Sequence, residues 1–277
     1  MATSRAAGEP VKAGRCQGRP MERGMRGNPH VPCGVGEKPE IRSKAYLSLY
    51  HFVRVYWDRG QSKEMRFHYF LGFEEPCMLY EETAAGDKTV WLNRKYETAL
   101  MNTGNYKIFN ALALEKVLIA HGGVILHASY VNYKGRALLF TAPSGTGKST
   151  QAALWEKYKG AEIVNGDRVI IREGREGYEA CGIPVCGSSD ICLNRTLPVA
   201  AIVYLQQGPE NLIYEMRFAE RVKRLVSETT ISFFDHDFVE RALNILQRIA
   251  AQVPCYYYSC TKDAGAVLAL YNTLKEI

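Results

Sequence analysis

The chain has 277 residues, of which 47% are hydrophobic and 23% charged, with a formal net charge of +6. These values are ordinary for a globular protein and leave ample material for one large core or two smaller ones. Residues 1–42 hold eight Lys and Arg against four Glu, so the other 235 residues carry a net charge of only +2. A folded part this close to neutral excludes a strong general affinity for nucleic acid.

Residues 1–42 predict a disordered basic tail. They contain seven Gly, five Pro and no aromatic residue, and such a stretch buries too little apolar surface to offset its ordering entropy. The tail has no central apolar run, so we do not interpret it as a secretory signal. A transit peptide is an alternative that four Glu and only two Ser or Thr argue against, and an extension without a role is another.

No segment approaches the ~20 apolar residues of a membrane span, so we expect a cytoplasmic protein. In that reducing compartment the eight Cys are expected to be free thiols, and none of them forms a CxxC pair. Cys181, Cys186 and Cys192 lie close together in the sequence and raise the alternative of a metal site. Their spacing, however, matches no common zinc or iron–sulfur pattern.

Residues 43–122 predict a small β-rich region followed by a helix. From residue 46 to about residue 94 the chain is rich in Tyr, Phe, Val and Leu with partial period-two alternation, which is typical of a small antiparallel sheet. From Asn105 to Gly123 the apolar residues change to helical spacing, and a Gly pair ends the run.

Residues 123–277 alternate strands with helices, which indicates an α/β layer fold with a mixed sheet. The first two strands, VILHASYV and RALLFT, are expected to form a hairpin around the short turn NYKG. If Val131 pairs with Arg136, then His127 lies opposite Phe140, to within one residue. His127 would then lie beside the loop that follows the second strand.

That loop, APSGTGKS from Ala142 to Ser149, matches the Walker A pattern with Ala142 in place of the first Gly. Its glycines let successive backbone N–H groups point inward at a phosphate, and the helix that starts near Lys148 adds its positive dipole end. In this interpretation Lys148 faces solvent or ligand and bridges the outer phosphates, while the Ser149 hydroxyl ligates Mg²⁺. The alternative is a Gly-rich turn with a chance Lys-Ser pair. The residues predicted to bind ATP are Ser144, Gly145, Thr146, Gly147, Lys148, Ser149 and Thr150.

Asp167 is the predicted second ligand of Mg²⁺. The helix after the loop leads to the strand AEIV, which is expected to run parallel to ALLF. The residues NGD at the end of that strand would then lie at the same sheet edge as the loop, where ligands bind in open α/β sheets. The alternative is an Asp in a Gly turn, which is common in proteins.

Four segments in this order, LHASYV, APSGTGKST, VNGDRV and CGIPVCG, resemble the catalytic domain of HPr kinase/phosphorylase over about Gly123 to Leu274. The resemblance implies a P-loop kinase whose fold is akin to that of phosphoenolpyruvate carboxykinase, in a family that is often oligomeric. The closing segment VPCYYYSCTKDAGAV resembles a looser branch of these relatives, some of which serve peptide-modifying systems.

The resemblance also implies roles for single residues. His127 matches the family histidine near the transferred phosphate, Lys148 and Ser149 match the P-loop pair, and Asp167 matches the acid near Mg²⁺. The family's other acid, the base for the acceptor hydroxyl, is Gly166 here. We therefore predict that His127 takes the acceptor proton or orients the phosphate, with a buried histidine bonded to backbone as the alternative.

The leading functional hypothesis is an ATP- and Mg²⁺-dependent phosphotransferase acting on a hydroxyl of a protein, a peptide or a small molecule. Its predicted catalytic residues are His127, Lys148 and Asp167. The residues before Gly123 do not resemble the usual N-terminal domain of HPr kinase, so HPr itself is not the predicted substrate. The absence of an acid at Gly166 favours the rival hypothesis, a nucleotide-binding sensor or scaffold without transfer activity. An ABC-type ATPase is excluded because the chain has no LSGGQ-like signature.

Overall fold

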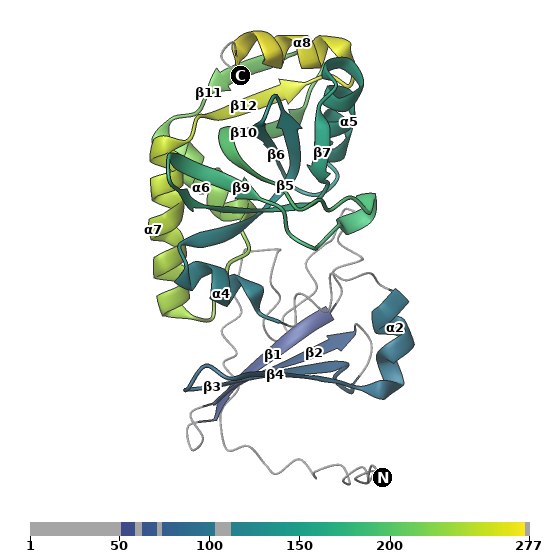
Figure 1. The fold of residues 1–277 in the computed structure, drawn as a ribbon, viewed down its shortest axis with the longest axis vertical. Coiled ribbons are helices and arrows are strands. Elements are labelled where there is room, and N and C mark those ends of the chain that lie inside the picture. The colour runs from purple at the N-terminus through teal and green to yellow at the C-terminus, as the bar shows by residue number, and fades with distance from the viewer. Residues whose placement is uncertain (1–50, 59–62, 71–73, 103–111, 275–277) are drawn as a thin grey trace.

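The structure, a computed structural model, describes residues 51–58, 63–70, 74–102 and 112–274 (Figure 1). It contains a small antiparallel sheet near the N-terminal end of this range and an α/β unit with a mixed sheet. The expected α/β fold preceded by a small β-rich region is therefore confirmed at this level. The predicted tail, residues 1–42, lies outside the described residues.

The small sheet has four antiparallel strands in the order β1-β2-β3-β4. Alternate positions of β2 are buried, which explains the period-two pattern of the sequence. A short helical segment follows the sheet, and Tyr96 and Leu100 from it pack against Cys77 and Met78. The bounds are β1 His51–Asp58, β2 Lys63–Phe70, β3 Met78–Thr83, β4 Lys88–Leu92, η1 Arg94–Tyr96 and α2 Glu97–Asn102.

The mixed sheet of the α/β unit has the order β11-β12-β10-β6-β5-β8-β9, and β7 pairs with β5 beside β8. Because β9 also pairs with the start of β10, the strands β10, β6, β5, β8 and β9 close into a ring. The strands are β5 Gly123–Tyr133, β6 Arg136–Thr141, β7 Glu162–Asn165, β8 Arg168–Gly174, β9 Gly177–Cys181, β10 Thr196–Gln207, β11 Leu212–Glu215 and β12 Cys255–Cys260.

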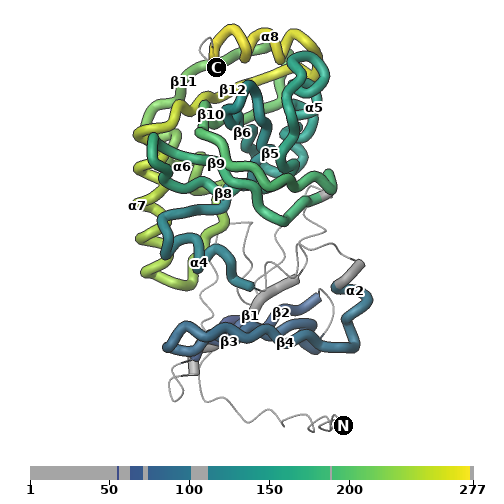
Figure 2. The backbone as a smooth tube through the Cα atoms, in the orientation of Figure 1, coloured from purple at the N-terminus to yellow at the C-terminus, as the bar shows by residue number. Residues whose placement is uncertain are grey.

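Helices cover both faces of this sheet, as Figure 2 shows in outline. The helices are α4 Leu114–Ala120, α5 Lys148–Lys159, α6 Phe218–Glu228, α7 His236–Gln252 and α8 Ala264–Thr273. Leu138 and Phe140 of β6 pack with Trp155 of α5, whereas Leu139 between them packs with Leu246 of α7. The apolar run of β6 is therefore continuous because both of its faces are buried.

The predicted hairpin is present, but its predicted register is wrong by two residues. Tyr133 pairs with Arg136 and Ala128 with Thr141, so His127 lies one position beyond the last pair of the hairpin. The physical reason is a two-residue turn, in which Lys134 and Gly135 both have positive φ, at 51° and 78°. Such a turn matches the right-handed twist of the strands better than a longer loop.

The strand β7 runs in the same direction as β6, as predicted, but β5 lies between the two and is antiparallel to both. The carboxyl ends of β6 and β7 are therefore at the same edge of the sheet. Of the predicted helix Asn105–Gly123, part lies outside the described residues, and the described helix α4 ends at Ala120. Gly122, with φ of 72°, ends it as expected, and Gly123 already begins β5.

A cluster of buried and partly buried ion pairs joins the small sheet to α4. Arg66 of β2 contacts Glu64 at 2.6 Å and Glu115 of α4 at 2.8 Å. Lys116 of α4 contacts Glu64 at 2.7 Å and Glu82 of β3 at 2.6 Å. Among the described helices, none is both long enough and apolar enough to cross a membrane.

Candidate functional site

The glycine-rich loop lies between the end of β6 at Thr141 and the start of α5 at Lys148. Gly145 has φ of 80° and Gly147 has φ of 111°, which are conformations that favour glycine. The side-chain amide of Gln207, at the end of β10, donates to the Gly145 carbonyl oxygen at 3.1 Å. The strand, loop and helix therefore follow one another as the sequence predicts, with the helix N-terminus at the sheet edge.

Lys148 is buried, so the predicted alternative in which it faces solvent is wrong, whereas the alternative in which it faces a ligand stays a prediction. Only 7% of the residue is exposed, and its Nζ donates to the carbonyl oxygens of Ala142 at 2.8 Å and Pro143 at 3.4 Å. The long side chain therefore folds back over the loop. Burial lowers the pKa of Lys148 to about 8, although the charges of Glu228 and Asp167 act to raise it.

The other residues predicted to bind phosphate differ in exposure. Ser149 and Thr150, in the first turn of α5, are exposed, whereas Ser144 and Thr146 are partly buried in the loop. An exposed hydroxyl at Ser149 is accessible to a metal ion without any rearrangement of the core. The first turn of a helix also presents backbone N–H groups that have no partner within the helix.

Asn165 organises the turn between β7 and β8, which carries Asp167. Its side chain is fully buried and donates to the carbonyl oxygens of Ile183 and Val185 at 3.0 and 2.9 Å. Its Oδ1 accepts from the backbone N–H groups of Asp167 and Arg168 at 2.8 and 2.9 Å. Asn165 was not predicted as a site residue, although an Asn two residues before the turn Asp is a known signal for such a turn.

The structure brings His127 and Asp167, which the sequence placed separately near the loop, into contact with each other. His127 Nε2 lies 3.5 Å from Asp167 Oδ1, and the Arg168 guanidinium Nε lies 3.3 Å from Asp167 Oδ2. Burial by itself would raise the pKa of Asp167, but the contact with His127 and the charges of Arg168 and Lys148 outweigh it and lower that pKa to about 2. Asp167 is therefore an ionised carboxylate at neutral pH.

A second carboxylate, Glu228, lies on the other side of the His127 ring, and sequence reasoning missed it. Glu228 Oε2 is 3.4 Å from His127 Nδ1, and the Glu228 side chain is only 1% exposed. The segment after Glu228 pairs with β5, because Thr229 forms an antiparallel β-bridge with Leu126. Arg168 closes the arrangement by donating to the Thr230 hydroxyl at 2.9 Å. No local pattern marks Glu228, because it is the last residue of an amphipathic helix far along the chain.

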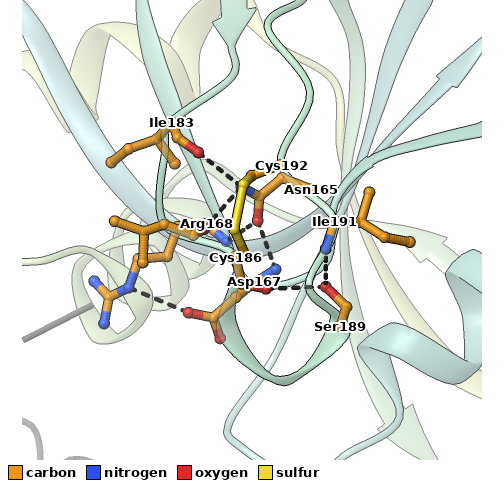
Figure 3. The surroundings of a disulfide bond; sticks show 9 residues. Asn165, Asp167, Arg168, Ile183, Cys186, Ser189, Ile191 and Cys192 are labelled. Carbon is orange, nitrogen blue, oxygen red and sulfur yellow. Dashed lines mark hydrogen bonds and ion pairs between the residues drawn. A yellow bond between two sulfur atoms is a disulfide. The ribbon is translucent and has the colours of Figure 1, made fainter. Parts of the chain in front are cut away.

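The position of the missing acid, Gly166, is covered by Ser189. A Cβ atom at Gly166 would lie 2.2 Å from Ser189 Oγ and 2.6 Å from Ser189 Cβ. Ser189 itself donates to the Cys186 carbonyl oxygen at 2.9 Å (Figure 3). The site therefore holds a serine hydroxyl where the resemblance implies a carboxylate.

Ser189 belongs to a loop that a disulfide closes. Cys186 and Cys192 are bonded, with their Cα atoms 5.0 Å apart, and Figure 3 shows the bond beside the turn that carries Asp167. The prediction of free thiols is therefore wrong for these two residues. The physical reason is the fold, since the backbone bridge between Asn165 and Cys192 holds the end of the loop against β7, within bonding reach of Cys186.

A protein-family model described as SynChlorMet cassette protein ScmC matches residues 93–264, which is more than half of the chain. The chain belongs to this family. The ScmC match includes the glycine-rich loop, the turn at Asn165–Arg168, and both His127 and Glu228. The site is therefore part of the region that defines the family, whose description names no reaction.

No curated protein matches the chain. Among solved structures, the chain is similar to the Hpr(Ser) kinase/phosphatase from Coxiella burnetii. The match has 11% sequence identity and a TM-score of 0.33, and covers 55% of this chain and 95% of that chain. A likeness at this TM-score carries no argument about activity, so the resemblance of the four sequence segments to HPr kinase stays a prediction.

Proposed function

We propose that this protein is an ATP- and Mg²⁺-dependent phosphotransferase that moves the γ-phosphate of ATP to a hydroxyl of a protein, a peptide or a small molecule. The observation that carries the proposal is the convergence of four features at one sheet edge. These are the glycine-rich loop, the N-terminus of α5, the cation Lys148, and the pair of His127 and Asp167. Phosphoryl transfer needs positioning and charge stabilisation above all, and these features supply both.

The residues present fit a magnesium ion. Asp167 carries an ionised carboxylate, and Ser149 carries an exposed hydroxyl at the start of α5. Mg²⁺ prefers such hard oxygen ligands and takes the rest of its shell from water and substrate phosphates, so a dedicated carboxylate cage is not needed. Bound there with ATP, the ion would neutralise charge on the phosphates during transfer.

In the proposed reaction the acceptor oxygen forms a bond to the γ-phosphorus while the bond from that phosphorus to the β–γ bridging oxygen breaks. ADP leaves with the bonding electron pair, and the acceptor proton passes to His127. Lys148 releases the carbonyl oxygens of Ala142 and Pro143 and turns to the phosphates, where its positive charge stabilises the developing negative charge. Backbone N–H groups of the loop hold the phosphates in place.

One observation favours a second function, a nucleotide-binding sensor or scaffold without transfer activity. Gly166 offers no carboxylate, and Ser189 occupies the space where one would lie. A positioned base contributes about 10²- to 10⁴-fold to a proton transfer, so its loss would leave a protein that binds ATP and transfers slowly or not at all.

Thermal denaturation with and without ATP and Mg²⁺ tests the binding step. The wild type should gain several degrees in melting temperature, because a ligand that binds only the folded state stabilises it. Lys148→Ala should lose this gain. Lys157→Ala is the matched control, since Lys157 is an exposed residue of the same helix and should keep the gain. A gain of equal size in Lys148→Ala would contradict the proposal that the glycine-rich loop binds ATP.

Transfer of label from [γ-³²P]ATP in the presence of Mg²⁺ and a cell lysate tests the chemical step. We expect label in an acceptor other than water, and a loss of about 10²-fold or more in His127→Ala with unchanged ATP binding. ATP-dependent stabilisation without any labelled acceptor would favour the sensor. The absence of both would overturn the proposed function.

A further inference from the structure

The strand β11 is the outermost strand of the mixed sheet, and most of its side chains are exposed (Figure 1). It pairs with β12 on one side, and no described strand pairs with its other side. Leu212 is 59% exposed and Tyr214 is 43% exposed. An open sheet edge is a template for another strand, and natural proteins usually protect such edges with charges, Pro or a covering loop. The only charged residue of β11, Glu215, is ion-paired with Arg221 and therefore protects the edge little.

The backbone hydrogen-bonding groups on the open side of β11 belong to Ile213 and Glu215. The Met216 N–H donates to the Cys255 carbonyl oxygen of β12 at 2.9 Å. In an antiparallel pair this direction repeats at every second residue, so the backbone of Tyr214 also bonds to β12. The residues between turn their N–H and C=O groups away from β12. Ile213 and Glu215 can therefore exchange backbone hydrogen bonds with a further antiparallel strand.

A row of tyrosines crosses the mixed sheet and stops at this open edge. Tyr204 of β10, Tyr257 of β12 and Tyr214 of β11 lie opposite one another in the strand register. The ring centroids of Tyr204 and Tyr257 are 6.4 Å apart, those of Tyr257 and Tyr214 are 5.0 Å apart, and both pairs are stacked. At the inner end of the row the Arg224 guanidinium lies over the Tyr204 ring at 4.2 Å. At the outer end no described strand lies beside Tyr214, so the row is open on that side.

The strand β11 is complementary to itself in one register. If Tyr214 lies opposite Tyr214 of a second copy, Ile213 and Glu215 form the hydrogen-bonded pairs, with the tyrosines as the non-hydrogen-bonded pair between them. The row of tyrosines then continues across the interface, and Leu212 lies opposite Met216 of the second copy. A register centred on Glu215 would set like charges opposite each other, which is destabilising. A register centred on Ile213 would place Leu212 opposite Tyr214 and would interrupt the row.

We propose that β11 is a homodimer interface, in which it pairs antiparallel with β11 of a second copy around Tyr214 and joins the two mixed sheets into one. Within one chain, β6, β10 and β12 are parallel to one another and β11 is antiparallel to β12. The β6 strands of the two copies therefore run in opposite directions, and the two glycine-rich loops lie at opposite edges of the joined sheet. Each candidate site is complete within one chain, so this inference does not rest on the proposed function.

Disulfide crosslinking tests the register. The Cα atoms of a non-hydrogen-bonded antiparallel pair are about 4.5 Å apart, within the range that a disulfide spans. Tyr214→Cys should therefore give a covalent dimer on mild oxidation, visible on a non-reducing gel and lost with a reducing agent. Leu212→Cys is the matched control, since the two copies of that residue would be separated by about 13 Å along the strands and should stay unlinked. The wild type gives the background from the native cysteines. A Tyr214→Cys variant that links no more than this background, or no more than Leu212→Cys, would overturn the inference.

Sedimentation velocity over a range of protein concentrations tests the dimer itself. The wild type should approach twice the mass of the chain as its concentration rises. Tyr214→Lys should raise the dissociation constant of the dimer about 10-fold or more, because it replaces a tyrosine pair by like charges that face each other. Tyr158→Lys is the matched control, since Tyr158 is 44% exposed but belongs to α5, and it should leave the dimer unchanged. If Tyr214→Lys does not fold, Leu212→Lys places a charge at the most exposed apolar position of the strand and should also weaken the dimer.

A wild type that stays monomeric at every concentration would overturn the inference and leave the edge to a strand of a different protein. Tyr214→Lys should keep the gain in melting temperature that ATP and Mg²⁺ give the wild type, because its candidate site is intact. The two proposals therefore fail differently. A dimer without an ATP-dependent gain refutes the proposed function alone, whereas a monomer with that gain refutes the dimer alone.

Discussion

At the residue scale, Gly166 shows that the surrounding structure leaves no room for the acid that is missing at this position. Its backbone has no unusual φ, so the requirement for glycine is steric and comes from Ser189. The Gly166 carbonyl oxygen accepts from the Ser129 hydroxyl at 2.9 Å, which fixes the peptide in place and leaves it little room to move away. Adding the acid that the HPr kinase resemblance implies would therefore not simply restore a base.

We predict that Gly166→Asp lowers the free energy of unfolding by about 1–3 kcal/mol, because overpacking a tight contact costs that much. Gly166→Asp combined with Ser189→Gly should recover most of this loss, since it removes the clashing Cβ and Oγ atoms. Urea denaturation of both variants and of Ser189→Gly alone measures the effect. A Gly166→Asp protein as stable as the wild type would show that Ser189 does not fill this position.

The loop between Cys186 and Cys192 matters at the element scale, because it packs on the turn that carries Asp167. Besides the contact of Ser189 with Gly166, a Cβ atom at Gly187 would lie 2.5 Å from Asp167 Cβ. Gly187 has φ of 58°, so both its conformation and its close approach require glycine. The disulfide closes the loop at both ends and holds these contacts together.

We predict that Cys186→Ser combined with Cys192→Ser lowers the free energy of unfolding by about 2 kcal/mol, because a closed loop of this length restricts the unfolded chain by that amount. A reducing agent should bring the wild type to the same stability and leave the double variant unchanged. Cys181→Ser is the control, since Cys181 is a partly buried free thiol near the loop. Complete alkylation of the unreduced, denatured wild type at all eight cysteines would contradict the disulfide.

At the scale of the whole molecule, one ion-pair cluster connects the small sheet to the α/β unit. Its members are Arg66, Glu64, Lys116, Glu82 and Glu115. Glu115 also accepts from the Ser232 hydroxyl at 3.0 Å, and the Arg66 guanidinium lies over the ring of Phe234 at 5.0 Å. These last two residues belong to the loop that follows Glu228. The small sheet, α4 and the segment beside the candidate site therefore share one network of polar and aromatic contacts.

We predict that Arg66→Met lowers the free energy of unfolding by about 3–5 kcal/mol, because it removes the ion-pair partner of Glu115 and leaves Glu64 with Lys116 alone. A double-mutant cycle with Glu115→Gln should give a coupling of about 0.5–3 kcal/mol. The exposed pair Arg172 and Glu179, 3.3 Å apart, is the control and should couple by no more than about 1 kcal/mol. Denaturation should remain a single transition. Two separate transitions, together with no coupling, would mean that the sheet and the α/β unit are independent.

The sequence by itself determined the elements whose conformation is set locally. The glycine-rich loop between β6 and α5, the amphipathic helices α6 and α7, and the hairpin of β5 and β6 follow from residue spacing and turn residues. His127 and Asp167 were found because they lie in short segments at recognisable positions around that loop. Asp167 was expected near the loop because strands that run in the same direction end at the same sheet edge, whereas His127 was placed there by the hairpin with the preceding strand.

Only the tertiary structure decided which distant residues complete the site. Glu228 reaches His127 through the pairing of the segment after α6 with β5, and Ser189 reaches Gly166 through the Cys186–Cys192 loop. The burial of Lys148 and the two-residue hairpin turn likewise depend on the carbonyls and strands that surround them. Contacts between residues far apart in the chain leave no periodic signal in the sequence, because each residue needs to match only its own local element.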